Sequence, residues 1–294
     1  MKLLYPFAKR YIAGDDIKSA QATANTLSDD GFALSFNYVG EYSKTLDEAT
    51  AARNKYSKIL NDYQDSKIDL SIKLSQFGLL ISPTDCESLI QQVVEKAHNY
   101  GHTIRFDMEH SKITDKTLDM CLKLNQKYPE TMGVALQAKL FRTKDDMREL
   151  MNNNVSVRLV KGAYIEKESI ALKSYQEIQE NYLRLIELLG TKIDRRCAVA
   201  THDENILNDI LSKPDADRFD YEFIYGIRRD LQQKLKDQGH KVRIYLPFGE
   251  NWLPYVWRRL REFKNLTFVV RSIFKEWFYN FYNNVFIFLA SMFN

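Results

Sequence analysis

Two adjacent arginines near the C-terminus carry the clearest chemical signal in the sequence. Arg258 and Arg259 lie in a predicted helix, and Glu262 follows within reach of either guanidinium group. Neighbouring guanidinium groups repel each other unless an anion lies between them, and each can bind a carboxylate through two parallel hydrogen bonds. Tyr245, at the preceding strand end, and Tyr255, one turn before the arginines, add flat aromatic surfaces. The pattern predicts a site for a small carboxylate, with a solvated basic helix face as the alternative.

Two further cations occur within apolar strands. Lys73 lies in the alternating segment 68–74 and Arg158 in the segment 155–160, where a charge is costly unless it is paired or binds an anion. Other polar residues follow at or near the predicted strand ends, namely Glu41, Asp107, Gln137, Lys161, Thr201, His202 and Glu222. This mixture of charges suits a phosphate-bearing cofactor together with a carboxylate substrate.

The chain reads as eight strand-then-helix units that would position these residues. The predicted strands cover residues 32–39, 68–74, 103–108, 133–138, 155–160, 197–201, 219–225 and 242–246. The predicted helices include segments 43–64, 83–99, 144–151, 166–189 and 203–211. Eight such units predict an α/β fold of the (β/α)8 TIM-barrel type, in which functional residues gather at the C-terminal ends of the strands. We expect a short N-terminal helical segment, a barrel domain over residues 1–276 and an aromatic-rich tail over residues 277–294.

Composition excludes several other classes. The 294 residues include 42 basic and 39 acidic side chains, and a net charge of +3 argues against a nucleic-acid-binding protein. None of the 11 glycines forms a Gly-x-Gly, which argues against a dinucleotide-binding open sheet. Cys86, Cys121 and Cys197 are widely spaced, so we expect a reducing compartment and no metal site. No apolar run suits a secretory signal or a membrane span, and the expected localisation is the cytoplasm.

Three motifs resemble one enzyme family. The segment Tyr-x-Pro-x-Gly-Glu beginning at Tyr245, and Tyr-x-x-Arg-Arg-Leu-x-Glu beginning at Tyr255, resemble the last strand and helix of the proline dehydrogenases. A further signature of that family, Arg-Leu-Val-Lys-Gly-Ala-Tyr, begins at Arg158. The resemblance extends from Ala13 to about residue 275. The chain resembles the monofunctional bacterial form of the family, and it is similar to the proline dehydrogenase domain of the bifunctional proline utilisation A proteins.

The resemblance implies an FAD cofactor across the C-terminal face of the barrel. It assigns Arg158 to flavin N5 and Gln137 to the pyrimidine edge. The segment Lys161, Gly162, Ala163 and Tyr164 matches the phosphate side, and Thr201, His202 and Glu262 match contacts on the adenosine half. For His202, which follows a strand and begins a helix, a capping or surface role is the alternative.

The resemblance also implies the substrate, L-proline. Arg258 and Arg259 match the pair that clamps its carboxylate, and the remaining matches are Lys73 beside them, Tyr245 and Tyr255 on the ring, Asp107 orienting the cations, and Glu41 closing a gate with Arg258. The implied reaction is hydride transfer from proline C5 to flavin N5, which gives Δ1-pyrroline-5-carboxylate. A membrane quinone would then take the electrons, and a separate pyrroline-5-carboxylate dehydrogenase would consume the product. Tyr245 favours proline over hydroxyproline, because a tyrosine would crowd a ring hydroxyl.

Some positions depart from the family pattern. Asn37 replaces an aspartate, Lys139 replaces a tyrosine, and the seventh strand, 221–226, is about two residues short. A catalytically impaired or non-catalytic barrel that binds flavin or proline is therefore one alternative, and a Schiff-base lyase using Lys73 or Lys161 is another. The tail 277–294 is expected to dock on the barrel, with peripheral contact at the inner face of the cell membrane as the alternative.

Overall fold

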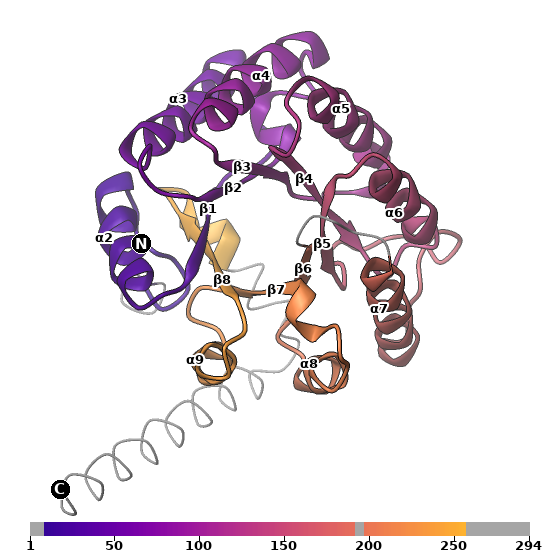
Figure 1. The fold of residues 1–294 in the computed structure, drawn as a ribbon. Helices are drawn as coiled ribbons and strands as arrows, with labels where there is room; N and C mark the ends of the chain where they lie inside the picture. Colours follow the sequence, from indigo (N-terminus) through magenta and orange to yellow (C-terminus); the bar gives the residue numbers. More distant parts are fainter. Residues whose placement is uncertain (1–8, 192–196, 257–294) are drawn as a thin grey trace, which may run out of the picture.

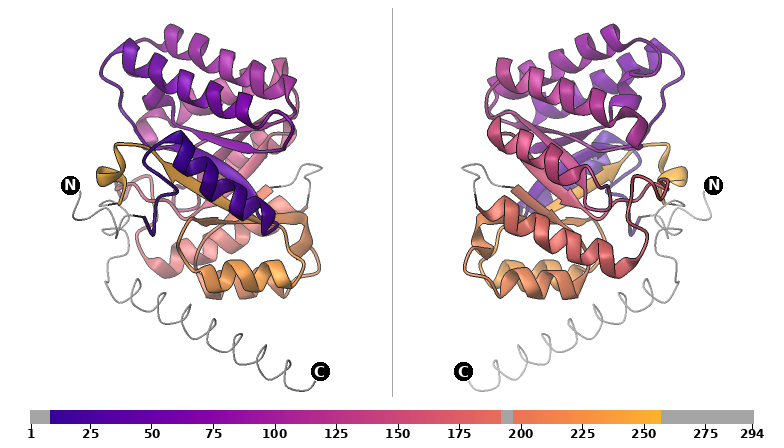
Figure 2. Two further views of the ribbon diagram at one scale, coloured as in Figure 1. Left: turned by 90° about the vertical axis from the view of Figure 1, so that its left-hand side faces the viewer. Right: turned by 90° about the vertical axis from the view of Figure 1, so that its right-hand side faces the viewer.

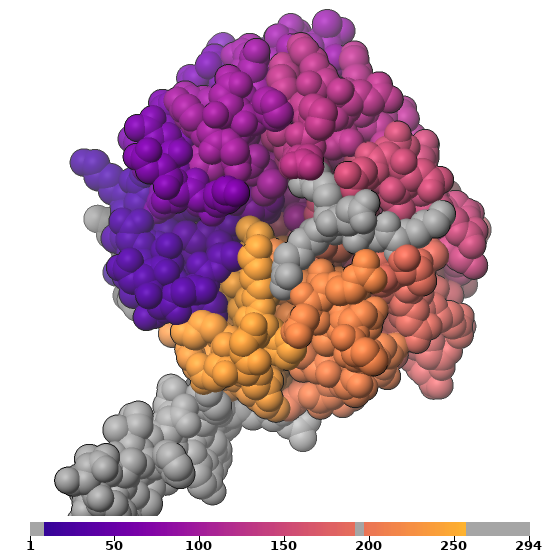
Figure 3. Space-filling view, in the orientation of Figure 1, coloured from indigo at the N-terminus to yellow at the C-terminus, as the bar shows by residue number. Residues whose placement is uncertain are grey.

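Eight parallel strands close into a barrel in sequence order (Figure 1). The computed structural model describes residues 9–191 and 197–256, so the predictions for Arg258, Arg259, Glu262 and the tail 277–294 lie outside the described residues. The strands are β1 (Ala33–Tyr38), β2 (Asp69–Ile72), β3 (Thr103–Phe106), β4 (Met132–Gln137), β5 (Ser156–Val160), β6 (Cys197–Ala200), β7 (Phe219–Ile224) and β8 (Val242–Phe248). Closure comes from parallel pairing of β1 with β8, in which Ser35 lies opposite Tyr245. The space-filling view accordingly shows the indigo start of the chain against the yellow segment of β8 (Figure 3). The (β/α)8 prediction is confirmed.

Helices surround the barrel on its outside (Figure 2). The α-helices are α2 (Ile17–Asp29), α3 (Leu46–Asp62), α4 (Pro83–Asn99), α5 (Thr114–Lys127), α6 (Thr143–Asn152), α7 (Tyr175–Gly190), α8 (Glu204–Leu211) and α9 (Arg229–Asp237). Short 3-10 turns are η1 (Leu74–Phe77), η2 (Ser111–Ile113) and η3 (Ala216–Arg218). Several helices begin where a Ser, Thr or Asp side chain accepts a hydrogen bond from a free amide of the first turn. The residues that do so are Asp16, Thr45, Ser82, Ser174 and Asp203.

The helix predicted over 166–189 begins nine residues later than expected. Ser174 accepts a hydrogen bond from the Glu177 amide and Glu177 caps Ser174 in return, so this capping box starts α7 at Tyr175. Residues 161–174 instead form a long loop after β5. An antiparallel bridge between Leu140 and Ala171 fixes this loop against the loop after β4. The functional segment after Arg158 is therefore loop and not helix.

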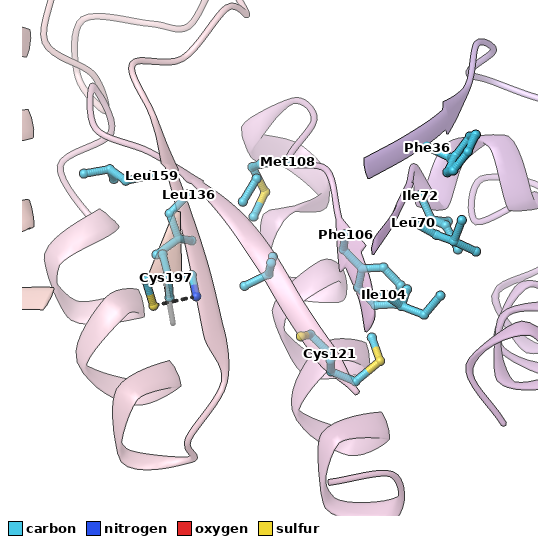
Figure 4. Packing of buried hydrophobic residues seen from close by; sticks show 14 of the residues in the cluster. Phe36, Leu70, Ile72, Ile104, Phe106, Met108, Cys121, Leu136, Leu159 and Cys197 are labelled. Carbon is cyan, nitrogen blue, oxygen red and sulfur yellow. Dashed lines mark hydrogen bonds between the residues drawn. The ribbon is translucent and has the colours of Figure 1, made fainter. Parts of the chain in front are cut away.

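The outward faces of the strands supply the apolar core between barrel and helices. Phe36, Leu70, Ile72 and Phe106 are completely buried in one cluster (Figure 4). Cys197 belongs to the same cluster, and its Sγ accepts a hydrogen bond of 3.1 Å from the Val157 amide. Alternation along each strand thus directs apolar side chains outward, which leaves the inward positions for other residue types.

The inward positions carry a network of charges instead of the aliphatic layers usual in such barrels. In the described residues this network contains four cations, Lys73, Arg105, Arg158 and Arg243, and four carboxylates, Asp69, Asp107, Asp220 and Glu222. None of these side chains is more than 12% exposed. The numbers of cations and carboxylates are equal, and each charge has a partner. The barrel interior can therefore hold these side chains although they are buried.

The shortened seventh strand still closes the barrel. β7 pairs with β6 from Cys197–Phe219 to Ala200–Glu222 and with β8 from Tyr221–Val242 to Ile224–Tyr245. A loss of two residues preserves the alternation of inward and outward side chains. Gly226, just beyond the strand, has φ +76°, and a Cβ there would lie 1.6 Å from the Arg10 carbonyl oxygen. Glycine is therefore required where the chain turns away from β7.

Candidate active site

A cavity of about 1140 Å³ opens at the C-terminal ends of the strands. This is larger than the usual range for a small ligand and has room for a dinucleotide-sized one. Eleven of the predicted site residues line it, namely Lys73, Asp107, Gln137, Arg158, Lys161, Gly162, Ala163, Tyr164, Thr201, His202 and Tyr245. Residues more than 170 positions apart in the sequence therefore meet in one cavity.

Asp107 is the centre of the polar network in the cavity wall. Its Oδ2 accepts hydrogen bonds from Lys73 Nζ at 2.9 Å and from the Tyr245 hydroxyl at 2.7 Å, and its Oδ1 accepts from Arg158 at 2.8 Å. Burial alone would raise the pKa of Asp107, but the charges of Lys73 and Arg158 outweigh it and lower that pKa below its ordinary value. Asp107 is therefore an ionised acceptor for three donors.

The same ion pair controls the charge of Lys73. Burial alone would lower the pKa of Lys73, but the Asp107 carboxylate raises it above its ordinary value. Tyr245 has its pKa raised, first by burial and then by Asp107. Both groups therefore remain protonated at neutral pH, and each acts as a hydrogen-bond donor.

Arg158 is held by three carboxylates, from β2, from β7 and from the residue that follows β3. Glu222 on β7 accepts from Arg158 Nε at 2.9 Å and lies 2.7 Å from its NH2 group through the other oxygen. Asp107 and Asp69 lie at 2.8 Å and 3.3 Å, and Ser35 accepts from the same guanidinium at 3.1 Å. Burial by itself would lower the pKa of Arg158, but these carboxylates raise it. The result is a permanent cation in one fixed orientation, with its Cζ 5.3 Å from the centre of the Tyr245 ring.

Gln137 and Gly162 form a close-fitting wall on another side. The Gln137 Nε2 donates a hydrogen bond of 3.0 Å to the Glu109 carbonyl, while its buried Oε1 has no hydrogen-bond partner among the described residues. Gly162 has φ +109°, and a Cβ there would lie 2.9 Å from both Gln137 Oε1 and a carbon of Lys139. The backbone can therefore approach this wall only because residue 162 is glycine.

The far side of the cavity is formed by β6 and the start of α8. Asp203 is the N-cap of α8, and it is bonded to Lys161 and to the Tyr175 hydroxyl. Lys161 also lies over the Tyr175 ring, 4.4 Å from its centre. The Nε2 of His202 accepts a hydrogen bond of 3.1 Å from the Ile224 amide. The capping role considered for His202 thus belongs to Asp203, and His202 instead joins β6 to β7.

Two predicted site residues in the described part of the chain lie outside the cavity wall. Tyr255 is 4% exposed and packs in a small cluster with Ile12, Val39 and Trp252. It is nevertheless near enough to Tyr245 to contribute to its raised pKa. Glu41 lies on the loop that follows β1, next to the barrel mouth. Their predicted roles on the substrate ring and at the gate stay predictions.

The departures from the family pattern are accommodated by local hydrogen bonds. The amide of Asn37 donates to the Ser71 carbonyl at 3.0 Å, a bond that an ionised aspartate could not make. The Nζ of Lys139 donates to the Tyr164 carbonyl in the loop 161–174. Lys139 thus holds the loop whose signature residues line the cavity.

Sequence reasoning missed several groups that shape the site. Asp69 holds Arg158, Glu109 holds Gln137 through its carbonyl, Asp203 holds Lys161, and the cavity-lining Arg228 is paired with Asp230 at 2.8 Å. Glu222, the other carboxylate on Arg158, was named among the polar strand-end residues, but its pairing with Arg158 was not foreseen. Asp69 could have been found, because it is a charge inside a buried alternation, the same signal that identified Lys73 and Arg158. Asp203 could also have been found, because its type and position suit a helix N-cap.

None of the helices in residues 9–191 and 197–256 has the length and hydropathy of a membrane span.

The closed barrel places the chain among the (β/α)8 proteins, whose functional sites lie at the C-terminal face of the strands. Comparison with known proteins then identifies the family. Residues 20–271 match the family model described as proline dehydrogenase. The chain is 33% identical to proline dehydrogenase of Deinococcus radiodurans and 30% identical to proline dehydrogenase 1 of Bacillus subtilis strain 168; in each case the match covers 92% of this chain and 91% of the relative. The chain belongs to the proline dehydrogenase family, and the predicted family is confirmed.

Solved structures agree on the fold. Proline utilization A from Bdellovibrio bacteriovorus, inactivated by N-propargylglycine, superposes with a TM-score of 0.79 at 20% identity. That match covers 91% of this chain and 34% of the other. Proline utilization A from Corynebacterium freiburgense superposes with a TM-score of 0.72 at 19% identity over 92% of this chain and 32% of the other. The chain thus spans about a third of the length of these solved structures.

Proposed function

We propose that this protein oxidises L-proline to Δ1-pyrroline-5-carboxylate with FAD bound in the cavity at the barrel mouth. The observation that carries the proposal is the fixed cation Arg158, held by Glu222 and Asp107 in the wall of a dinucleotide-sized cavity. Membership of the proline dehydrogenase family supports the substrate.

Three features of the cavity suit such a cofactor. Gln137 offers a buried acceptor oxygen that suits an N–H donor at the edge of a flavin. Gly162 keeps open a space that a Cβ would fill. Lys161 supplies a cation beside this glycine, as the phosphates of FAD require. Gln137, Arg158, Lys161, Gly162, Ala163, Tyr164, Thr201 and His202 would hold FAD, with Glu262 added from outside the described residues.

FAD, when bound, supplies the acceptor for the hydrogen and electrons removed from the substrate. The protein supplies charge and position. Arg158 presents a positive charge that needs no reorganisation, since its carboxylate partners already fix its plane. Asp107 keeps Lys73 charged and the Tyr245 hydroxyl oriented. Lys73, with Arg258 and Arg259, would attract the proline carboxylate, Tyr245 and Tyr255 would pack on its ring, and Glu41 would close the gate.

The charge state of Lys73 argues against the lyase alternative. A Schiff base requires a neutral amine, whereas Asp107 raises the pKa of Lys73 above its ordinary value against the effect of burial. Lys161 is engaged with Asp203 and with the ring of Tyr175. Neither lysine is therefore prepared to attack a carbonyl.

Several wider assignments belong to the same proposal. Electrons would pass from the reduced cofactor to a membrane quinone, and a separate dehydrogenase would oxidise the product. Residues 1–276 would form the catalytic domain and 277–294 a distinct tail. The protein would act in the cytoplasm, with peripheral contact at the inner face of the membrane as the route to the quinone.

The test is to incubate the purified protein with FAD, L-proline and a soluble quinone and to identify the product by mass spectrometry. We expect a product lighter than L-proline by two hydrogens and an equal amount of reduced quinone. Lysine trapping by borohydride serves as the control for the lyase. Substrate-dependent labelling of Lys73 or Lys161, without quinone reduction, would contradict the proposal.

A further inference from the structure

Glu109 is a buried glutamate just behind the cavity wall. It follows Asp107 and Met108, which line the cavity, and it is itself 1% exposed. Its Oε2 has no hydrogen-bond partner among the described residues. Burial raises the pKa of Glu109, which favours the neutral carboxyl form. No step of the proposed reaction uses this residue, so its burial calls for another explanation.

The side chain of Glu109 fastens the turn η1. Its Oε1 accepts a hydrogen bond of 3.1 Å from the Ser75 amide. Ser75 in turn holds the loop after β1, because its Oγ accepts from the Tyr42 amide at 3.1 Å and its carbonyl accepts from the Ser43 amide at 3.1 Å. Tyr42 and Ser43 directly follow Glu41, the predicted gate residue. The position of Glu41 therefore depends on η1, and η1 is tied to Glu109.

The backbone of Glu109 holds the opposite side of this connection. Its carbonyl accepts a hydrogen bond of 3.0 Å from Nε2 of Gln137, which is 2% exposed and lines the cavity. The contacts run from Gln137 through Glu109 and Ser75 to Tyr42, and the first two of these bonds are buried. A single residue thus links the proposed cofactor edge to the loop that carries Glu41.

A second support of the same loop reinforces η1 as its platform. Ser43 Oγ donates to the Gln76 carbonyl at 2.6 Å, and the Gln76 side chain donates to the Tyr38 carbonyl at 3.0 Å. Loop 39–45 is therefore attached to η1 through Tyr42 and Ser43, and the end of β1 just before it is attached through Tyr38. Because η1 is short, loss of its tie to Glu109 would affect the whole loop.

We propose that Glu109 is a positioning residue that sets the loop 39–45, and with it Glu41, relative to Gln137 in the cavity wall. The structural part of this inference concerns only contacts within the chain. Its catalytic part rests on the proposed function, because Glu41 acts as a substrate gate only if proline enters this cavity.

The structural part is tested by hydrogen exchange of the peptide spanning residues 39–45 in wild type, Glu109→Ala and Glu109→Gln. Two amides of this peptide donate to Ser75, so we expect exchange to be about tenfold faster in Glu109→Ala. Glu109→Gln keeps an acceptor oxygen for the Ser75 amide and should exchange within about twofold of wild type. If Glu109→Ala does not fold, Ser75→Ala, which removes only the acceptor for Tyr42, should still accelerate exchange.

The matched control is Glu166→Ala. Glu166 also accepts from a serine, with bonds of 2.8 Å from the Ser111 amide and 2.6 Å from its hydroxyl, but it holds the loop 161–174. This variant should accelerate exchange in 161–174 and leave 39–45 unchanged. Unchanged exchange of 39–45 in Glu109→Ala, or equal acceleration by Glu166→Ala, would overturn the inference.

The catalytic part is tested by steady-state kinetics with L-proline on the FAD-loaded protein. A displaced gate loop should raise KM for proline about tenfold in Glu109→Ala with kcat within about threefold, and Glu109→Gln should restore KM. A change in KM without faster exchange of 39–45 would refute the positioning role. Faster exchange in a protein that never oxidises proline would uphold the positioning role and refute the proposed function.

Discussion

Asp107→Asn is the substitution that tests the polar network most sharply. All three partners of Asp107, namely Lys73, Arg158 and Tyr245, are donors. A carboxylate accepts from all of them, whereas an asparagine has one acceptor oxygen and one NH2 group. The variant must therefore turn a donor toward at least one of these donors.

The size of the effect depends on which orientation of the substituted amide has the lower free energy. If the amide oxygen replaces Oδ2, then Lys73 and Tyr245 keep their acceptor and Arg158 faces the NH2 group. Arg158 still has Glu222 at 2.7 Å and Asp69 at 3.3 Å, so it is not left unpaired. We therefore expect a loss near that of one charged hydrogen bond, about 2–3 kcal/mol, and not the larger loss seen when a buried ion pair is broken completely.

Two assays measure the loss. The free energy of unfolding in urea should fall by about 2–3 kcal/mol, which corresponds to roughly 3–5 °C in Tm for a chain of this size. If the transition state for proline oxidation is destabilised by the same amount, about 2–3 kcal/mol, kcat/KM for proline should fall roughly 30- to 150-fold. Both losses arise from the changed surroundings of Arg158 in the folded protein, so the fall in stability and the fall in kcat/KM should appear together.

Asp220→Asn is the matched control. Asp220 is also buried and accepts a hydrogen bond of 2.8 Å from Arg243. It precedes the cavity-lining Glu222 by two residues on β7 and does not itself line the cavity. This variant should lose stability without a change in kcat/KM. Asp107 does not have this role if Asp107→Asn keeps a free energy of unfolding within about 0.5 kcal/mol and a kcat/KM within about threefold of wild type, or if both variants lose activity equally.

Three further predictions follow from single contacts. Gly162→Ala should weaken FAD binding at least about tenfold by fluorescence titration, because its Cβ would lie 2.9 Å from Gln137 Oε1; Gly239→Ala, with φ +85° but open space around it, should bind FAD as wild type does. Ser174→Ala should lower the free energy of unfolding by about 1 kcal/mol, since it removes the N-cap of α7, and an unchanged value would contradict the capping role. The pKa of Asp107 is lowered from 3.8, so its stabilising effect is present above that pH and is lost as the pH falls through the folded value. The stability difference between wild type and Asp107→Asn should therefore be constant from about pH 5 to pH 7 and shrink below about pH 4, and a constant difference down to about pH 2 would contradict this assignment.

The barrel could be predicted from the sequence because its signal is local. Each strand carries apolar residues at alternate positions, and each is followed by a helix, so eight units determine the architecture without knowledge of side-chain contacts. Arg158 and Lys73 were found by the same alternation, as charges at positions that the core would exclude. The sequence also allowed the barrel to close through a short seventh strand, because a two-residue loss keeps the alternation, and β7 does pair with β6 and β8.

The parts that escaped prediction depend on contacts between distant segments. The start of α7 was misplaced, although the capping box Ser174-Tyr-Gln-Glu177 was visible in the sequence, because residues 166–173 alone do not exclude a helix. Glu109 follows β3 in a loop, and nothing local distinguishes it from a solvated glutamate. Its role arises only when folding brings Ser75 and Gln137 to its two sides.

The proposed function requires the charged mouth of this barrel to bind FAD and to oxidise proline there. The most direct measurement is the visible absorption spectrum of the FAD-loaded protein before and after anaerobic addition of L-proline. We expect a protein-bound flavin spectrum that bleaches with proline and not with hydroxyproline at the same concentration. A flavin that binds and stays oxidised in the presence of L-proline would contradict the proposed activity, and failure to bind FAD at all would contradict the assignment of the cavity.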